Sequence, residues 1–325
     1  MRRRALLRAP EIEAPVSARF EELDWQDTRM GELTLRRRAD PATGEQIYEV
    51  KLKDEYLMSS LFTVAEEELA TLGLAAAAGS DLRVLVGGLG LGYTAATALI
   101  DARVGWLTVI DALPAVIGWH ERELLPVSAQ LVRDERVSLV HDDFFAVVRR
   151  APGSEDVRYD VILLDVDHSP RHTLDPSHAD LYTAAGLESL ARHLADGGVF
   201  ALWSDDPPDA DFLSTVSSVF DDTKAHVVEF ANRLTGGTSS NTVYVAARRY
   251  SAVGRTLNGS SNEGATVSTP ADHVEPHHIP EPGEPSVPEI EVDETVAPRP
   301  EEEVADVARA EPDVGDHAPS AGRDR

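Results

Sequence analysis

Cysteine is absent from the 325 residues, and aromatic side chains make up only 6% of them. The lack of cysteine excludes disulfide bonds and thiolate metal sites, and it fits a reducing cytoplasm. Basic residues are also scarce, because 30 lysines and arginines stand against 57 aspartates and glutamates and give a net charge of −27. Nucleic acids and anionic membrane surfaces bind basic proteins. We therefore expect neither as a partner.

Long hydrophobic runs are missing as well. No stretch approaches the roughly 18 consecutive apolar residues that a membrane-spanning helix needs. The first ten residues are basic, but no apolar segment follows them as it does in a signal peptide. Apolar residues still make up 42% of the chain, which is enough for a large core. These features predict a cytoplasmic protein.

Composition divides the chain into four parts. Residues 251–325 hold 17 acidic and 5 basic residues, together with 10 of the 20 prolines. Such a segment cannot bury enough apolar surface to offset the entropy of ordering it, so we predict a disordered acidic tail. The remaining parts are a flexible arm (1–18), an N-terminal β-hairpin module (19–60) and an α/β domain (61–250).

The N-terminal module is predicted from the alternation of residues between the two faces of a strand. Residues 20–38 suggest a strand with alternating faces, and residues 46–53 alternate at period two after turn-forming residues at 40–45. We expect a small antiparallel hairpin over residues 31–58.

A glycine-rich turn follows the first strand of the α/β domain. Residues 82–86, which are apolar except for Arg83, read as a buried parallel strand, and the small residues 93–100 read as a helix. Glycines at alternate positions permit unusual backbone angles and let a ligand approach main-chain N–H groups. The pattern predicts a ligand-binding loop formed by Gly87, Gly88, Gly90 and Gly92.

Strands and helices alternate beyond this turn. We expect further strands at 106–111, 137–141, 159–165, 199–204, 224–230 and 242–247, and helices at 62–78, 115–125, 145–150, 179–194 and 211–220. The helix at 179–194 should be stopped by Asp196, Gly197 and Gly198. The last two strands are too close in sequence for a crossover helix, so they should be antiparallel. The predicted fold is α/β, with a doubly wound and mostly parallel sheet of seven strands.

Acidic residues end several of these strands, where ligands of such sheets bind. Asp111 lies just over twenty residues beyond Gly88, where a carboxylate accepts hydrogen bonds from a ribose, although it could instead cap a helix. Asp142 or Asp143 could accept a hydrogen bond from an adenine amine or, equally, cap the next helix.

The glycine spacing argues against a dinucleotide. The turn reads G-x-G-x-G, whereas the dinucleotide fingerprint reads G-x-G-x-x-G. The order of elements, with an antiparallel pair at the end, resembles the S-adenosylmethionine-dependent transferases (class I methyltransferase fold).

Several segments are more specific than the order of elements. The N-terminal hairpin, the stretches 84–88, 109–117, 159–165 and 194–202, and Leu181-Tyr182-Thr183 resemble the spermidine synthase (polyamine aminopropyltransferase) family over about residues 30–247. The resemblance implies a decarboxylated S-adenosylmethionine donor, a small-molecule amine acceptor and a homodimer. It also implies that Asp111 binds the ribose, Asp143 binds the adenine amine and Asp165 is the catalytic carboxylate.

Two positions depart from the family pattern. Gly90 stands where the family usually has an aspartate that binds the donor amine, and the loop at 165–170 is one residue longer than the family's Asp-x-x-Asp-Pro. The candidates for contact with the acceptor are Asp167 and His168 in this loop and Tyr182 after it.

Two other functions remain open. One is an S-adenosylmethionine-dependent methyltransferase, in which Asp165, Asp167, Asp205 and Asp206 could hold Mg²⁺ or Ca²⁺ for O-methyl transfer. We favour a simple turn at 205–208 and expect no metal. The other is a non-catalytic binding module on the same fold.

Overall fold

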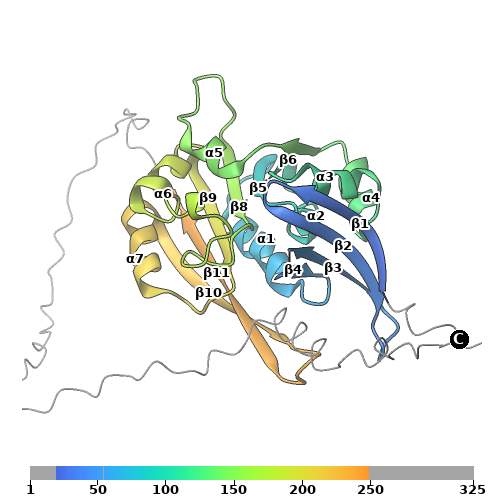
Figure 1. The fold of residues 1–325 in the computed structure, drawn as a ribbon. Helices are drawn as coiled ribbons and strands as arrows, with labels where there is room; N and C mark the ends of the chain where they lie inside the picture. The colour runs from blue at the N-terminus through green and yellow to red at the C-terminus, as the bar shows by residue number, and fades with distance from the viewer. Residues whose placement is uncertain (1–19, 54, 249–325) are drawn as a thin grey trace, which may run out of the picture. The chain divides into compact units, whose positions relative to one another are not determined.

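The computed structural model describes residues 20–53 and 55–248. The predicted arm (1–18) and acidic tail (251–325) lie outside this range. Within it, an antiparallel N-terminal sheet precedes a larger α/β sheet (Figure 1).

The N-terminal sheet has four strands in the order β1-β2-β3-β4, and each strand is antiparallel to the next. They are β1 (Phe20–Thr28), β2 (Gly31–Ala39), β3 (Gln46–Leu52) and β4 (Glu55–Ser59). The hairpin predicted over 31–58 is therefore part of a larger sheet, and the single strand suggested for 20–38 was wrong. A tight turn divides it, in which Thr28 Oγ1 accepts a hydrogen bond from the Met30 N–H at 3.1 Å.

The large sheet has the order β10-β11-β9-β8-β5-β6-β7. Its strands are β5 (Leu82–Gly87), β6 (Val104–Asp111), β7 (Val137–His141), β8 (Tyr159–Leu164), β9 (Leu194–Ser204), β10 (Asp221–Ala231) and β11 (Thr238–Ala247). The pairs among β5, β6, β7, β8 and β9 are parallel, whereas β11 is antiparallel to both β9 and β10. The predicted doubly wound, mostly parallel sheet of seven strands is confirmed.

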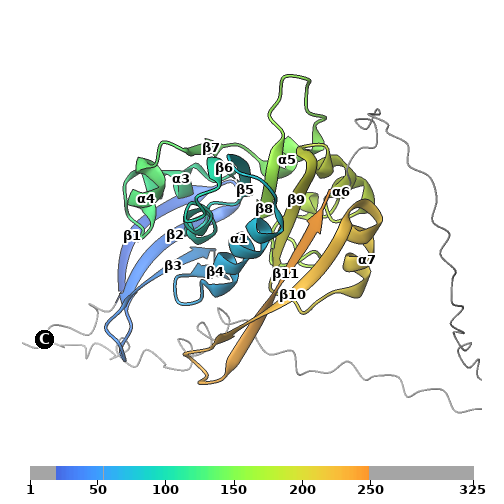
Figure 2. The same cartoon turned by 180° about the vertical axis from the view of Figure 1, so that it is seen from behind.

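Helices cover both faces of this sheet (Figures 1 and 2). One face carries α1 (Val64–Ala76), α2 (Tyr93–Ala98), α3 (Pro114–Glu121) and α4 (Ser128–Arg133). The other face carries α5 (Phe144–Arg149), α6 (Ala184–Ala191) and α7 (Ala210–Val219). None of the helices in the described part of the chain is both long and apolar enough to span a bilayer.

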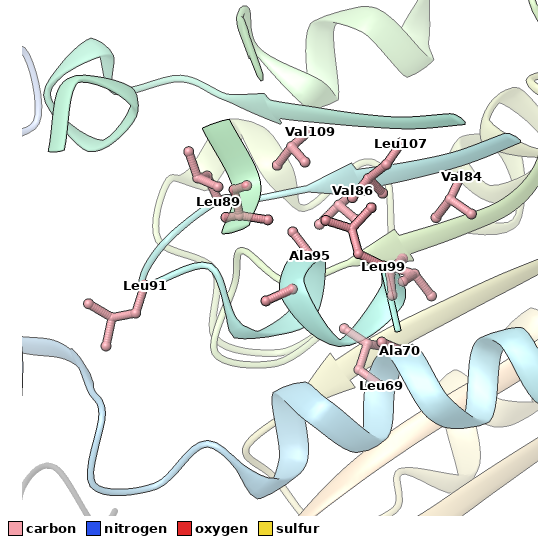
Figure 3. Packing of buried hydrophobic residues seen from close by; sticks show 14 of the residues in the cluster. Leu69, Ala70, Val84, Val86, Leu89, Leu91, Ala95, Leu99, Leu107 and Val109 are labelled. Atoms are coloured by element: carbon pink, nitrogen blue, oxygen red, sulfur yellow. The ribbon is translucent and has the colours of Figure 1, made fainter. Parts of the chain in front are cut away.

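The core beneath the glycine turn is built from alternate residues of the central strands. Val84 and Val86 of β5 pack with Leu107 and Val109 of β6 on the side of α1 and α2 (Figure 3). The intervening Leu85 points to the opposite cluster, with α5 and α6. The continuous apolar runs of the parallel strands are thus explained by burial on both faces.

Several predicted boundaries differ from the structure. The helix expected at 179–194 occupies only Ala184–Ala191, because a short 3-10 helix (Pro176–His178) and a turn precede it. Strand β9 begins at Leu194 and runs through Gly197 and Gly198, which were interpreted as a helix stop. A register shift between Tyr159 and Val161 of β8 accommodates these glycines as an irregularity within the sheet. Helix α4 was not predicted, since its six residues show too few turns for a periodic pattern.

Candidate functional site

The glycine turn joins β5 to α2 at the carboxyl end of the sheet, between the ends of β6 and β8. The Gly88 N–H donates to the Ile110 carbonyl at 2.9 Å, and the Asp165 N–H donates to the Gly87 carbonyl at 2.8 Å. Gly88 has φ +94°, and a Cβ atom there would lie 2.0 Å from the main-chain oxygen of Asp165. This backbone contact explains why only glycine fits at position 88.

Asp111 ends β6 and holds the turn through its backbone. Its Oδ2 accepts a hydrogen bond from the Leu89 N–H at 2.9 Å, and its Oδ1 accepts one from the Leu113 N–H at 2.8 Å. Burial raises the pKa of Asp111, although the backbone N–H groups act in the opposite direction. The structure therefore places Asp111 directly against the predicted ligand loop.

Asp165 follows β8 and faces the first turn of α2. The Thr94 hydroxyl donates a hydrogen bond of 2.6 Å to Oδ2 of Asp165 and also lies 3.3 Å from the Glu66 carbonyl oxygen. Burial raises the pKa of the Asp165 carboxyl to about 6, despite the bond from Thr94 that favours the charged form. Such a carboxyl gains and loses a proton close to neutral pH, which suits it to proton transfer.

Asp142 and Asp143 follow β7 on the other side of β6. Oδ1 of Asp143 accepts a hydrogen bond from the Ala146 N–H at 3.2 Å and so caps α5. Asp142 is exposed, and its backbone N–H donates to the Asp111 carbonyl at 3.2 Å. Asp142 thus adjoins Asp111, and the capping role considered for this pair is occupied by Asp143.

The three residues predicted to contact the acceptor lie in or beyond the loop after β8. Asp167 is buried, and its oxygens accept hydrogen bonds from the Tyr182 hydroxyl at 2.7 Å, His178 Nδ1 at 2.8 Å and the Leu174 N–H at 2.8 Å. The His178 ring stacks on Phe145 with centroids 3.7 Å apart. Burial, followed by the Asp167 charge, raises the pKa of Tyr182 well above its usual value. The structure brings Asp167 and Tyr182 together as an anchor for this loop.

The same loop carries His168. The His168 side chain is half-buried. The main-chain carbonyl of His168 accepts a hydrogen bond from the Asp205 N–H at 2.7 Å. The end of β9 is thereby joined to the loop that starts at Asp165.

A pocket of about 450 Å³ opens between this loop and α7. His172 lies on its wall with Nδ1 2.9 Å from Asp206 Oδ2, and Arg171 forms an ion pair with Asp209. Neither Asp165 nor the glycine turn lines this pocket, so it is separate from the site around them.

The carboxylates considered as metal ligands have other partners. Asp205 Oδ1 accepts a hydrogen bond from Asn241 Nδ2 at 2.7 Å, whereas Asp167 is held by Tyr182 and His178. Over residues 20–53 and 55–248, no group of three or more histidines and carboxylates is arranged to hold a metal ion.

Sequence reasoning missed two residues of the site, Thr94 and His120. Thr94 directly follows the turn in α2, so its proximity to the end of β8 follows once β8 is known to lie beside β5. His120 lies beneath the turn with Nε2 3.0 Å from the Gly90 carbonyl oxygen. The sequence did contain a signal for the burial of His120, because Val116, Trp119 and His120 are spaced to share one face of a helix, and this face of α3 is buried.

Comparisons with known proteins agree at the level of the fold. No protein-family model matches the chain, and no curated protein matches it in sequence. The crystal structure of spermidine synthase from Thermotoga maritima superposes with a TM-score of 0.54 and 18% identity, covering 71% of this chain and 74% of that chain. A spermidine synthase in complex with the transition-state analogue AdoDATO gives a TM-score of 0.56 with the same identity and coverage. The chain is therefore similar to the spermidine synthases and has their fold.

Proposed function

We propose that the protein is a transferase that moves an aminopropyl group from decarboxylated S-adenosylmethionine to a small-molecule amine. The observation that carries the proposal is the Asp165 carboxyl, which lies beside the glycine turn and has a pKa of about 6. In the reaction, the amine nitrogen forms a bond to the carbon next to the sulfonium, and the carbon–sulfur bond breaks to release neutral methylthioadenosine. The attacking amine loses one proton, which the Asp165 carboxylate accepts.

The donor is assigned to the turn and the residues around it. Gly87, Gly88, Gly90 and Gly92 let the ligand approach the backbone, and Asp111 retains lone pairs for the ribose hydroxyls besides those used by Leu89 and Leu113. Asp143 is our candidate for the adenine amine. Its neighbour Asp142 is the second candidate, because its carboxylate is more exposed.

The acceptor is assigned to the opposite side of Asp165, toward the loop after β8. His168 is the candidate for direct contact in this loop. Asp167 and Tyr182 support the site by holding the loop in place through their mutual hydrogen bond of 2.7 Å. An amine acceptor also suits the net charge of −27, which attracts cations.

Calorimetric titration with decarboxylated S-adenosylmethionine, S-adenosylmethionine and methylthioadenosine tests the donor. We expect the decarboxylated donor to bind at least tenfold more tightly than the carboxylated one. Turnover is then followed as methylthioadenosine release with a panel of di- and triamines, in wild type and in Asp165→Asn. Asp160→Asn is the matched control, because Asp160 lies at the opposite end of the same strand. Equal turnover in the Asp165 and Asp160 variants would remove Asp165 from the mechanism.

Methyl transfer is the second candidate, and Gly90 favours it. The turn offers no carboxylate at this position to bind the donor amine, which weakens the expected preference for a decarboxylated donor. Tighter binding of S-adenosylmethionine in the same titration would support this candidate. Absence of binding by all three compounds would reject both enzymes and leave a binding module.

A further inference from the structure

The imidazole of His120 lies directly beneath the glycine turn. His120 is in the last turn of α3 and is fully buried. Its Nε2 lies 3.0 Å from the Gly90 carbonyl oxygen, and its Nδ1 lies 3.2 Å from the Ser128 hydroxyl. A histidine enclosed in this way uses both ring nitrogens, and neither faces solvent.

The partners fix which nitrogen carries the proton. The Gly90 carbonyl can only accept, so Nε2 carries the proton and donates to it. In the neutral ring, Nδ1 is then the acceptor and receives a hydrogen bond from the Ser128 hydroxyl, whose Oγ accepts the Leu125 N–H at 3.2 Å. Burial lowers the pKa of His120 and keeps the ring in this neutral form.

Gly92 provides the room for the ring. A Cβ atom at position 92 would lie 2.7 Å from Cε1 of His120, and Gly92 has φ +90°. A side chain at this position would meet the histidine below the turn, together with Leu131 and Val127, whatever binds above it.

The turn is held from two sides. Asp111 accepts the Leu89 N–H at 2.9 Å on one side, and His120 holds the Gly90 carbonyl on the other. Gly90 itself has φ +46°, a conformation that an unrestrained turn would leave readily. The two bonds together restrain the Gly88–Leu89 and Gly90–Leu91 peptides, which precede and follow the peptide that joins Leu89 to Gly90.

We propose that His120 is a positioning residue, which keeps the glycine turn in the shape that binds the adenosyl ligand. The identity of the ligand rests on the proposed function, whereas the effect of His120 on the turn does not. His120 would touch neither donor nor acceptor, and it acts through Gly90 alone.

The experiment compares three variants. His120→Leu removes the donor, whereas His120→Gln retains a side-chain N–H that can reach the Gly90 carbonyl. His193→Leu is the matched control, since His193 is also buried and its Nε2 lies 3.0 Å from a backbone oxygen, that of Arg150. Each protein is titrated with methylthioadenosine, and amide hydrogen exchange is measured for the peptide covering residues 82–95.

We expect His120→Leu to weaken binding about tenfold, in line with the loss of one buried hydrogen bond, and to speed exchange in the turn. His120→Gln should recover most of the affinity, and His193→Leu should bind within twofold of wild type. Equal affinities, or equal exchange of the turn, in His120→Leu and His193→Leu would overturn the proposal. If wild type binds no adenosyl compound, the proposed function fails, and the exchange comparison alone decides the role of His120.

Discussion

The Thr94 hydroxyl lies 2.6 Å from Oδ2 of Asp165 and joins the helix after the glycine turn to the end of the neighbouring strand. The bond places the candidate catalytic carboxyl and the candidate donor loop in one hydrogen-bonded unit. A movement of the turn would therefore displace Asp165 or break this hydrogen bond.

Asp165→Asn should stabilise the protein at neutral and alkaline pH. The pKa of this carboxyl is about 6 in the folded protein and 3.8 as a free group, so ionisation opposes folding above about pH 4. The cost grows as the pH rises to about 6 and then stays constant, at about 2–3 kcal/mol. Urea unfolding should show this gain for Asp165→Asn at pH 8 and little gain at pH 3.5. Asp160→Asn is the control, and a less stable Asp165→Asn at pH 8 would contradict the prediction.

Gly88→Ala should destabilise the protein much more than Gly79→Ala. The two glycines have nearly equal φ, +94° and +96°, but only position 88 places a Cβ against backbone, whereas nothing lies within 4 Å at position 79. The shared backbone strain costs about 1 kcal/mol, and the contact with Asp165 should add about 2 kcal/mol or more. Thermal and urea unfolding of both variants measure the difference. Similar losses at the two positions would mean that the turn can move away from β8.

Asp143→Ser should separate capping from ligand binding. Serine caps a helix nearly as well as aspartate, so α5 should lose little stability, whereas Asp143→Ala should lose about 1 kcal/mol. If Asp143 binds the adenine amine, both variants should bind methylthioadenosine about tenfold more weakly, by loss of a charged hydrogen bond. Asp142→Ala tests the second candidate for the adenine amine without a capping effect, because Asp142 caps no helix. Unchanged binding by Asp143→Ser would assign this residue to capping alone.

Asp167→Ala should cost about 3–5 kcal/mol of unfolding free energy, because it leaves a buried tyrosine hydroxyl, a histidine and a backbone N–H without their partner, and each unsatisfied buried donor costs about 1–3 kcal/mol. Tyr182→Phe removes only one of these bonds and should cost about 1–2 kcal/mol. Urea unfolding gives both values. Equal costs for the two variants would show that Asp167 does not organise the loop.

Much of the fold could be predicted because buried parallel strands are recognisable in the sequence as apolar runs between turns. Residues 84–86 and 161–164 are buried on both faces, so their composition alone indicates strands. The N-terminal sheet was harder, since the turn before Gly31 contains Arg29 and Met30 and lacks the usual turn residues. Gly197 and Gly198 were wrongly interpreted as a helix stop, because glycine occurs both at the ends of helices and in irregular strands.

The site was predictable where it depends on strand order and unpredictable where it depends on packing. Asp111 and Asp165 end strands on either side of β5, so the fold class alone brings them to the turn. Thr94 and His120 required knowledge of which helix packs against which strand end. Their partners are 71 and 30 residues away in sequence, and no local pattern records such a pairing.

The position of β11 has a consequence for how the protein is made. This strand is the last one described, yet it is hydrogen-bonded on both sides, to β9 and to β10. Until residues 238–247 have left the ribosome, β9 therefore keeps an unpaired edge and β10 has no neighbour in the sheet. A growing chain exposes that edge to other chains while residues 205–247 are being added, which makes it a target for chaperones and a starting point for aggregation.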